Sequence, residues 1–165
     1  MPDLDWWRAD PTRWTGLAYL RDESEDGPGD HHADVRAEVL ERLAADHRAT
    51  DAEFLRFLLA EETRWHAASW GISESLRLAA LLLHKCGQVE DVWAIWDAKN
   101  TNMDTSLGMN TSVLFIAGLA GTLEFIRNSA HPDRDELLEY LETETPPDEE
   151  WLRESLEFEH RYHRM

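Results

Sequence analysis

Apolar residues recur at intervals of three and four along most of the chain after about residue 34, and no stretch alternates as a strand does. Because 3.6 residues complete one turn of an α-helix, this spacing predicts amphipathic helices. The pattern indicates an all-α fold of about seven helices. We expect these helices to pack either as a compact orthogonal bundle or as a short array of helical hairpins.

Capping residues and breakers predict where the helices begin and end. Asp10 and Pro11 favour a helix start, with the helix ending near Arg21. Thr50 and Glu53 fit a capping box for a helix of residues 50–68. Further helices are expected from Ser73 to a stop at Gly87, over residues 89–97 and 111–128, and in two acidic segments after residue 131.

Residues 22–32 break the helical pattern, because they combine Gly, Pro and acidic side chains without an apolar period. We interpret this segment as a loop or mobile connector. It divides the chain into a Trp-rich N-terminal arm of residues 1–33, with one short helix, and an all-α helical domain of residues 34–165.

The charge balance constrains the partner. The 165 residues include 34 Asp and Glu against 16 Lys and Arg, so the formal net charge is -18. A surface this negative repels phosphate groups, which argues against direct binding to nucleic acid or to an anionic membrane. The two ends carry most of the charge, with a net of -6 in residues 1–34 and -8 in residues 131–165. A basic protein partner is therefore expected.

The sequence contains no signal-peptide pattern and no run of about 18 apolar residues, which predicts a cytoplasmic protein without membrane spans. Its single cysteine, Cys86, excludes an internal disulfide, and no Cys and His set fits a structural zinc site. We do not interpret Cys86 as an activated nucleophile, because no His or basic group is expected to be placed to activate it. We expect no cofactor, no metal and no catalytic residue.

Acidic and aromatic side chains are the candidate partner-binding residues. Like charges at helical spacing destabilise a helix slightly, so an acidic stripe is consistent with selection for a basic partner as well as with solubility alone. Trp side chains add anchoring area to such a surface. The candidates are Asp22, Glu23, Glu25 and Asp26 in the acidic loop, Asp135, Glu139 and Glu142 on one terminal helix, Glu150, Glu154 and Glu157 on the last helix, and Trp6 and Trp7 in the arm.

Two other local patterns have both a structural and a functional interpretation. Glu62 and His66 lie four residues apart on one helix face and are a possible acid/base pair or half of a metal site, although a structural role is the simpler interpretation. The tripeptide His131-Pro132-Asp133 matches the one that J-domain co-chaperones use to contact their chaperone. Only these three residues match, and a helix start at Pro-Asp explains them equally well.

The segment 78–99, a helix ending at Cys86-Gly87 and followed directly by an aromatic helix, resembles a tetratricopeptide hairpin, although no second copy at a fixed period is visible. This resemblance implies a groove that binds a peptide or a helix. Its candidate residues are Trp93, Trp96, Lys99, Asn102 and Asp104.

Residues 78–121, with the run Gly-Gln-Val-Glu-Asp-Val-Trp-Ala-Ile-Trp-Asp-Ala-Lys, also resemble a group of small uncharacterised bacterial proteins, mainly from actinobacteria. That resemblance implies a helical, intracellular bacterial protein and carries no catalytic residues. In size, charge and helical content the chain is also similar to immunity proteins that neutralise toxins.

The leading hypothesis is a non-enzymatic acidic binding protein, an immunity or antitoxin-like inhibitor that masks the basic, nucleic-acid-type active site of a toxin or nuclease. The first alternative is a tetratricopeptide-like scaffold that binds a peptide or helix. The second is a small-molecule or metal-dependent enzyme that uses Glu62 and His66.

Overall fold

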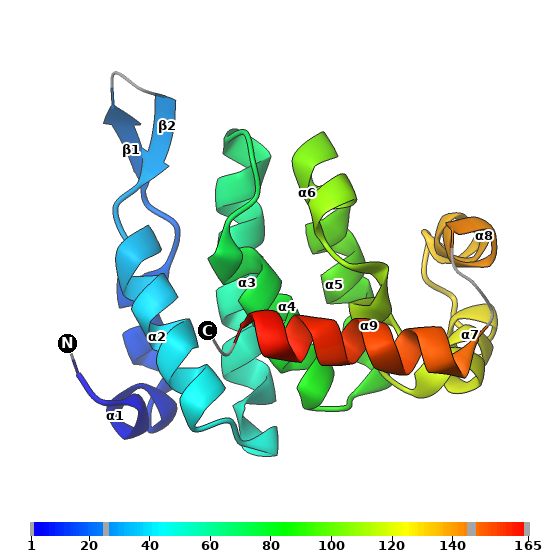
Figure 1. Cartoon of the computed structure of the whole chain (residues 1–165). Helices are drawn as coiled ribbons and strands as arrows, with labels where there is room; N and C mark the ends of the chain where they lie inside the picture. The colour runs from blue at the N-terminus through cyan, green and yellow to red at the C-terminus, as the bar shows by residue number, and fades with distance from the viewer. Residues whose placement is uncertain (1, 25–26, 145–147, 164–165) are drawn as a thin grey trace.

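The computed structural model describes residues 2–24, 27–144 and 148–163, and helices dominate it (Figure 1). The all-α class is confirmed. No helix among the described residues is long and apolar enough to cross a membrane. The elements are the α-helices α1 (Leu4–Arg8), α2 (Ala33–Ala45), α3 (Ala52–Ala68), α4 (Glu74–Lys85), α5 (Val92–Lys99), α6 (Met103–Gly108), α7 (Gly118–Arg127), α8 (Arg134–Glu144) and α9 (Glu149–Tyr162), the 3₁₀ helices η1 (Pro11–Leu17), η2 (Ala49–Asp51), η3 (Val89–Asp91) and η4 (Thr111–Leu114), and the strands β1 (Arg21–Ser24) and β2 (Gly27–Asp30).

The helices from η1 to η4 form two layers. In the first layer α3 packs between η1 and α5, and in the second layer α4 packs between α2 and η4. Contacts between α3 and α4 and between α5 and η4 join the layers. This arrangement corresponds to the predicted array of helical hairpins, because each successive pair adds one helix to each layer.

The hairpins share a local structure that the sequence analysis did not detect. Asp51 and Asp91, 40 residues apart, each end a three-residue 3₁₀ helix and are followed at once by an α-helix. Each carboxylate is buried and accepts two hydrogen bonds from an arginine of an earlier element, Arg8 for Asp51 and Arg56 for Asp91. The feature that repeats is therefore an Asp–Arg contact between neighbouring hairpins. The residues around this contact differ between the two copies.

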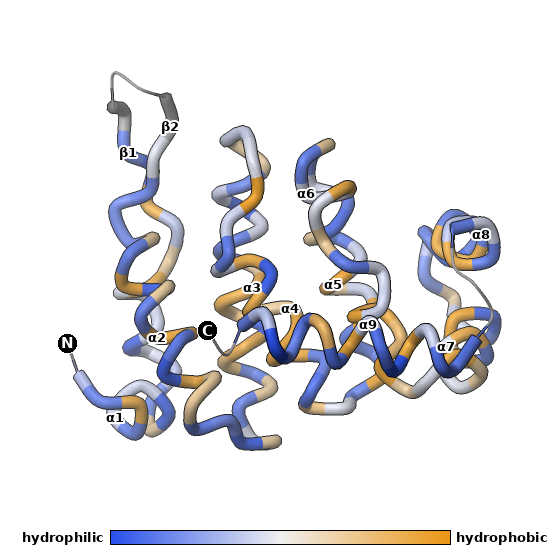
Figure 2. The backbone as a smooth tube through the Cα atoms, in the orientation of Figure 1, coloured by the Kyte–Doolittle hydropathy of each residue, from blue (hydrophilic) through white to orange (hydrophobic). Residues whose placement is uncertain are grey.

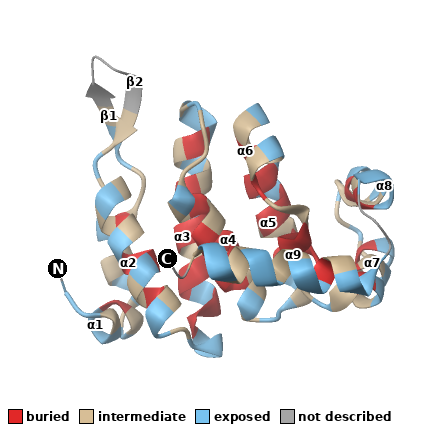
Figure 3. Ribbon diagram, in the orientation of Figure 1, coloured by how far each residue is buried: buried red, intermediate tan, exposed pale blue. Residues whose placement is uncertain are grey.

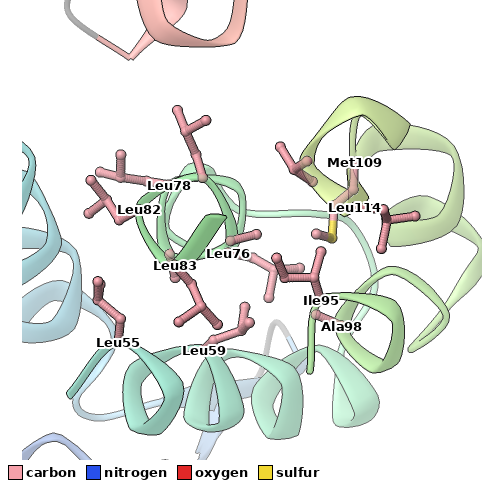
Figure 4. Packing of buried hydrophobic residues seen from close by; sticks show 14 of the residues in the cluster. Leu55, Leu59, Leu76, Leu78, Leu82, Leu83, Ile95, Ala98, Met109 and Leu114 are labelled. Atoms are coloured by element: carbon pink, nitrogen blue, oxygen red, sulfur yellow. The ribbon is translucent and has the colours of Figure 1, made fainter. Parts of the chain in front are cut away.

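The hydrophobic core is centred on α4, which is apolar nearly all round, as the sequence predicts. Figure 4 shows leucines of α4 between α3 on one side and α5, Met109 and Leu114 on the other. Such a helix requires cover on several sides, and α2, α3, α5 and η4 supply it. Ser73 caps the start of α4 by accepting from Leu76 N, and Gly87 with a positive φ of 74° follows its end, both as predicted.

Helix α9 lies across the array rather than within it. It contacts η4 and α7, and its C-terminal end reaches α4, where the Tyr162 hydroxyl donates to Glu74 Oε1 at 3.2 Å. In Figure 1 it runs from the α7 end back toward α2. Hydrophilic and hydrophobic residues alternate along α9 in Figure 2, and its outer surface is exposed in Figure 3. This pattern is expected for an amphipathic helix that packs one face against the array.

The N-terminal segment docks on the helical array. Trp7 and Leu17 belong to the same hydrophobic cluster as the central helices, with exposed fractions of 5% and 0%. Arg8 holds the segment to the α2–α3 connection through Asp46 and Asp51. The segment from α1 to η1 thus contributes to the shared core.

Several local predictions were wrong. The segment 22–32 is not a plain loop, because β1 and β2 pair antiparallel within it. The helix expected from Asp10 to Arg21 is the short 3₁₀ helix η1, which ends at Leu17, although Asp10 caps it as expected by accepting from Thr12 N. The sequence analysis did not predict the short helix α1 that precedes it. The start of α3 is organised by Asp51, whose Oδ2 accepts from Arg48 N, rather than by the expected Thr50 capping box.

The expected helix 111–128 is also divided. The 3₁₀ helix η4 ends at Leu114, and α7 begins only at Gly118, which has a positive φ of 72°. This left-handed backbone conformation is one that glycine adopts readily and that interrupts a helix.

Candidate functional site

The predicted acidic residues of the terminal helices all lie on the surface. Asp135, Glu139 and Glu142 on α8 are exposed, and so are Glu150, Glu154 and Glu157 on α9. Within the described residues, no cationic side chain lies within ion-pair distance of Glu139, Glu154 or Glu157. Asp135, Glu142 and Glu150 each pair with a surface arginine, at 2.8, 2.9 and 3.3 Å. We call the six residues the acidic face.

Most arginines of the described chain are already engaged with carboxylates. Several of these contacts hold elements together, such as Arg8 with Asp46 and Asp51. On the acidic face, Glu139, Glu154 and Glu157 are therefore exposed without a compensating cation among the described residues. A surface of this kind attracts a basic partner at long range.

Aromatic side chains also lie beside the acidic face. Phe158 and Tyr162, on α9, are exposed by 55% and 41%, and their rings lie 6.3 Å apart at 25°. The sequence analysis placed the aromatic anchors in the N-terminal arm instead. The sequence feature that points to an exposed Phe158 is its position between Glu157 and Glu159 on an acidic helix, where an apolar side chain is unusual.

The N-terminal candidates are only partly available to a partner. Trp6 is 41% exposed and lies under the Arg13 guanidinium, whereas Trp7 is buried in the core and corrects the prediction that it is a surface anchor. Asp22 is half-buried and lies 3.6 Å from His31 Nε2. The strand β1 includes Glu23, whose side chain is outside the described structure, and Glu25 and Asp26 lie outside the described residues.

The predicted groove is closed. Trp96 and Lys99 are 3% and 1% exposed, and Trp93 stacks on His131 with ring centroids 3.9 Å apart. Asn102 and Asp104 join α6 to the α3–α4 connection, where the Asn102 amide donates to His66 O at 3.0 Å and Asp104 Oδ2 accepts from Gly71 N at 2.7 Å. Trp96 and Lys99 are thus too buried to line an open groove, which corrects their assignment, whereas Trp93, Asn102 and Asp104 are half-buried.

An exposed apolar patch lies next to this closed groove. Trp70 is 91% exposed, and Met103 and Leu107 on α6 are 74% and 81% exposed. The Gly71–Asp104 hydrogen bond brings the two segments together at one end of the array. We call these three residues the apolar tip. The sequence analysis missed them, although Met103 and Leu107 are apolar residues four apart in a polar stretch.

Glu62 and His66 have structural roles. His66 Nδ1 donates to Glu62 O at 2.7 Å, and Nε2 accepts from Ser73 N at 2.9 Å. Both ring nitrogens of the neutral imidazole are thus in use. The Glu62 carboxylate accepts from Arg36 Nε at 2.8 Å and from the Ser73 hydroxyl at 3.1 Å, and all these groups are buried or half-buried. Neither side chain is free for proton transfer or metal binding.

Cys86 does have a histidine neighbour, contrary to the sequence interpretation. His47 Nε2 lies 3.5 Å from Cys86 Sγ and 3.0 Å from Leu82 O, to which it donates its proton. Burial raises the pKa of the Cys86 thiol, and the carboxylates of Asp51 and Asp91 raise it further. The pair therefore favours the thiol over the reactive thiolate.

The tripeptide His131-Pro132-Asp133 forms the turn before α8. His131 Nδ1 accepts from Asp133 N at 3.2 Å, and its ring lies flat on Trp93. These contacts account for the tripeptide as a local structural element.

The described residues contain no group of three or more His, Cys, Asp or Glu side chains placed to hold a metal ion. The acidic face and the apolar tip are the two exposed surfaces described above that are available to a partner. Comparisons of the chain with models of protein families, with curated proteins and with solved structures find no match.

Proposed function

We propose that this chain is a non-enzymatic binding protein that captures a basic partner protein through the acidic face of α8 and α9. An immunity protein or antitoxin acts in this way when its carboxylates occupy the places of nucleic-acid phosphates in a toxin or nuclease. We place this function in the bacterial cytoplasm. The observation that carries the proposal is the exposure of Glu139, Glu154 and Glu157 without a cationic neighbour among the described residues.

The geometry of α9 supports this proposal. Because α9 lies over the array with its outer side exposed, a partner can approach a full row of carboxylates without any rearrangement of the core. Complementary charge accelerates association and favours one partner over others, whereas affinity also requires a desolvated contact. Phe158 and Tyr162 provide apolar area for such a contact at the end of the row.

Changing Glu154 and Glu157 to Lys should weaken capture of the basic partner by on the order of 10- to 100-fold at low salt, mainly through slower association. The assay is affinity capture from the native lysate at low salt with mass spectrometry. The captured protein is then purified, and its association kinetics are measured at two salt concentrations. Capture by the wild type should fall steeply as ionic strength rises.

Glu53→Lys with Glu90→Lys is the matched control, because both residues are exposed, lie outside α8 and α9, and change the net charge by the same amount. This control should retain most of the wild-type affinity. Equal loss in both pairs, or recovery of no basic protein, contradicts the proposal.

The apolar tip favours a second candidate function, a helical scaffold that binds an apolar peptide segment of a partner. Three large apolar side chains that are 74% to 91% exposed and lie on neighbouring segments form an unusual feature for a monomer surface. Binding to the apolar tip does not depend on attraction between charges, unlike binding to the acidic face. The affinity for the apolar tip should therefore be insensitive to salt.

Trp70→Ser should leave the free energy of unfolding unchanged within about 0.5 kcal/mol, because the side chain contributes almost nothing to the core. If the tip binds a partner, the same change should abolish the salt-insensitive part of capture. Leu20→Ser, at a residue that is 52% exposed on another part of the surface, is the control. Capture that is unaffected by Trp70→Ser at every salt concentration excludes this second function.

A further inference from the structure

A cleft with a volume of about 420 Å³ lies between α2, α4 and the C-terminal end of α9. Its lining residues are Ala37 and Glu41 from α2, Glu74, Ser75 and Leu78 from α4, and Tyr162 and His163 from the end of α9. The cleft opens beside the exposed Phe158 and Tyr162 rings. It is thus continuous with the surface to which we assign partner binding.

The carboxylates of the cleft have unused acceptor capacity. Glu41 is exposed and has no ion-pair partner among the described residues. Glu74 Oε1 accepts from Tyr162 Oη at 3.2 Å and from Arg77 at 3.3 Å, whereas the single described neighbour of Oε2 is His163 Nδ1 at 4.0 Å. No lysine or arginine is among the described lining residues. Two carboxylates with free acceptor positions therefore line the cleft.

The remaining walls suit the rest of a long cationic side chain. Leu78, which is 7% exposed, and Ala37 provide an apolar floor for methylene groups. The Tyr162 ring is held in place by the hydrogen bond of its hydroxyl to Glu74 and by the adjacent Phe158 ring. An aromatic face of this kind stacks favourably on a guanidinium.

His163 completes the cleft on the α9 side. Its side chain is only 8% exposed, and its Nε2 has no hydrogen-bond partner among residues 2–24, 27–144 and 148–163 and lies 3.7 Å from Glu159 Oε2. Burial by itself raises the pKa of Glu159, but the contacts with His163 and Asn110 outweigh burial and lower it. The ionised Glu159 adds a further negative charge behind the imidazole.

We propose that this cleft receives an arginine side chain of the basic partner, with the guanidinium between Glu41 and Glu74 and its flat face on Tyr162. The inference rests on the proposed function and names the point at which the partner is anchored. An arginine fits better than a lysine because its planar, multi-donor head can bond two carboxylates and stack on a ring at the same time.

The test is a titration of the full ¹⁵N-labelled chain with the capped tripeptide Gly-Arg-Gly, followed by NMR. We expect saturable shifts confined to the amides of the cleft-lining residues, with an affinity of about millimolar for so small a ligand. The same peptide with citrulline, which is neutral and of the same shape, should produce no saturable shift. Binding of Gly-Lys-Gly as tight as that of Gly-Arg-Gly, or shifts spread over the acidic surface, overturns the proposal.

Glu41→Gln should weaken binding of the arginine peptide about tenfold, because it removes one charge-assisted contact and leaves the shape of the side chain unchanged. Glu38→Gln is the control, since it makes the same charge change one turn earlier on α2, at an exposed residue outside the cleft. An equal effect of the two changes overturns the cleft as the site.

The partner assay separates this inference from the function on which it rests. If the Glu154 and Glu157 reversal abolishes capture of the basic partner and Glu41→Gln does not change its affinity, the cleft proposal fails and the proposed function stands. If neither variant affects capture, the proposed function itself fails.

Discussion

Arg36→Met should lower the free energy of unfolding by roughly 3–5 kcal/mol, which is the typical cost of removing one partner from a buried ion pair. The Arg36 side chain is fully buried between the carboxylates of Asp30 and Glu62, which are also fully buried. Its Nε donates to Glu62 Oε1 at 2.8 Å, and its terminal nitrogens donate to Asp30 Oδ2 and Leu17 O. The variant leaves both carboxylates in the interior without a cation.

The pH dependence of this variant follows from the same contacts. Burial alone raises the pKa of Asp30, but hydrogen bonds from Leu20 N and His32 N, together with Arg36, outweigh it and lower the pKa. In the wild type this lowering contributes stability above the normal carboxyl pKa of 3.8, and that stability is lost as the pH falls through the folded-state pKa. Without Arg36, protonation of the carboxylates relieves the buried charge, so the deficit of the variant should shrink in acid.

Urea unfolding at pH 7 and at about pH 4.5 measures both effects. Adding Glu62→Gln to Arg36→Met should recover part of the loss at pH 7, because one of the two uncompensated charges is then absent. If Arg36→Met lowers the free energy of unfolding by less than 1 kcal/mol at pH 7, water reaches these groups. The ion pairs of Arg36 then do not anchor the β1–β2 hairpin to α2 and α3.

Between about pH 8 and pH 10.5 the contribution of Lys99 to the free energy of unfolding should rise with pH by up to about 3 kcal/mol, and Lys99→Met should lack this gain. Burial lowers the pKa of Lys99 from 10.5 to about 8. The side chain is 1% exposed, and no carboxylate of the described residues lies within ion-pair distance. Its Nζ instead donates to Ser106 O and Met109 O, the latter at 2.7 Å.

The sign follows from proton binding. In this pH range the unfolded chain still holds the Lys99 proton, whereas the folded chain has released it. The free energy of unfolding therefore rises with pH. Cys86 acts in the opposite direction, because burial raises its pKa and the unfolded chain loses the thiol proton first.

The informative quantity is thus the difference in unfolding free energy between the wild type and Lys99→Met, measured across pH 7.5–10.5, since Cys86 is present in both chains. A difference that does not change with pH contradicts the lowered pKa. It would mean that the two carbonyls compensate the buried ammonium in full.

The periodic pattern of the sequence was sufficient for the helical class and for several helix ends. Ser73 and Gly87 act at the two ends of α4 because capping and positive φ are local properties of single residues. The acidic residues of α8 and α9 are exposed as predicted, because charged side chains at helical spacing define the side of a helix that stays in water.

Other features depend on which distant segments meet, and local spacing does not contain that information. Trp7, in the short helix α1, is buried, whereas Trp70, just after α3, is exposed. Asp30, Arg36 and Glu62 form one buried cluster only because the β1–β2 hairpin, α2 and α3 converge. The 40-residue repeat was hidden for the same reason, since it consists of the Asp51 and Asp91 contacts with arginines far away in the chain.

The sequence by itself therefore determined the helical class, several helix ends and the side of each terminal helix that faces water. The tertiary structure alone decided which polar groups are buried and paired, that the predicted groove is filled by Trp96 and Lys99, and that Glu41, Glu74 and Tyr162 surround a cleft. The physical reason is that periodicity reports how one helix divides its faces, whereas burial depends on the packing of several helices around the same point.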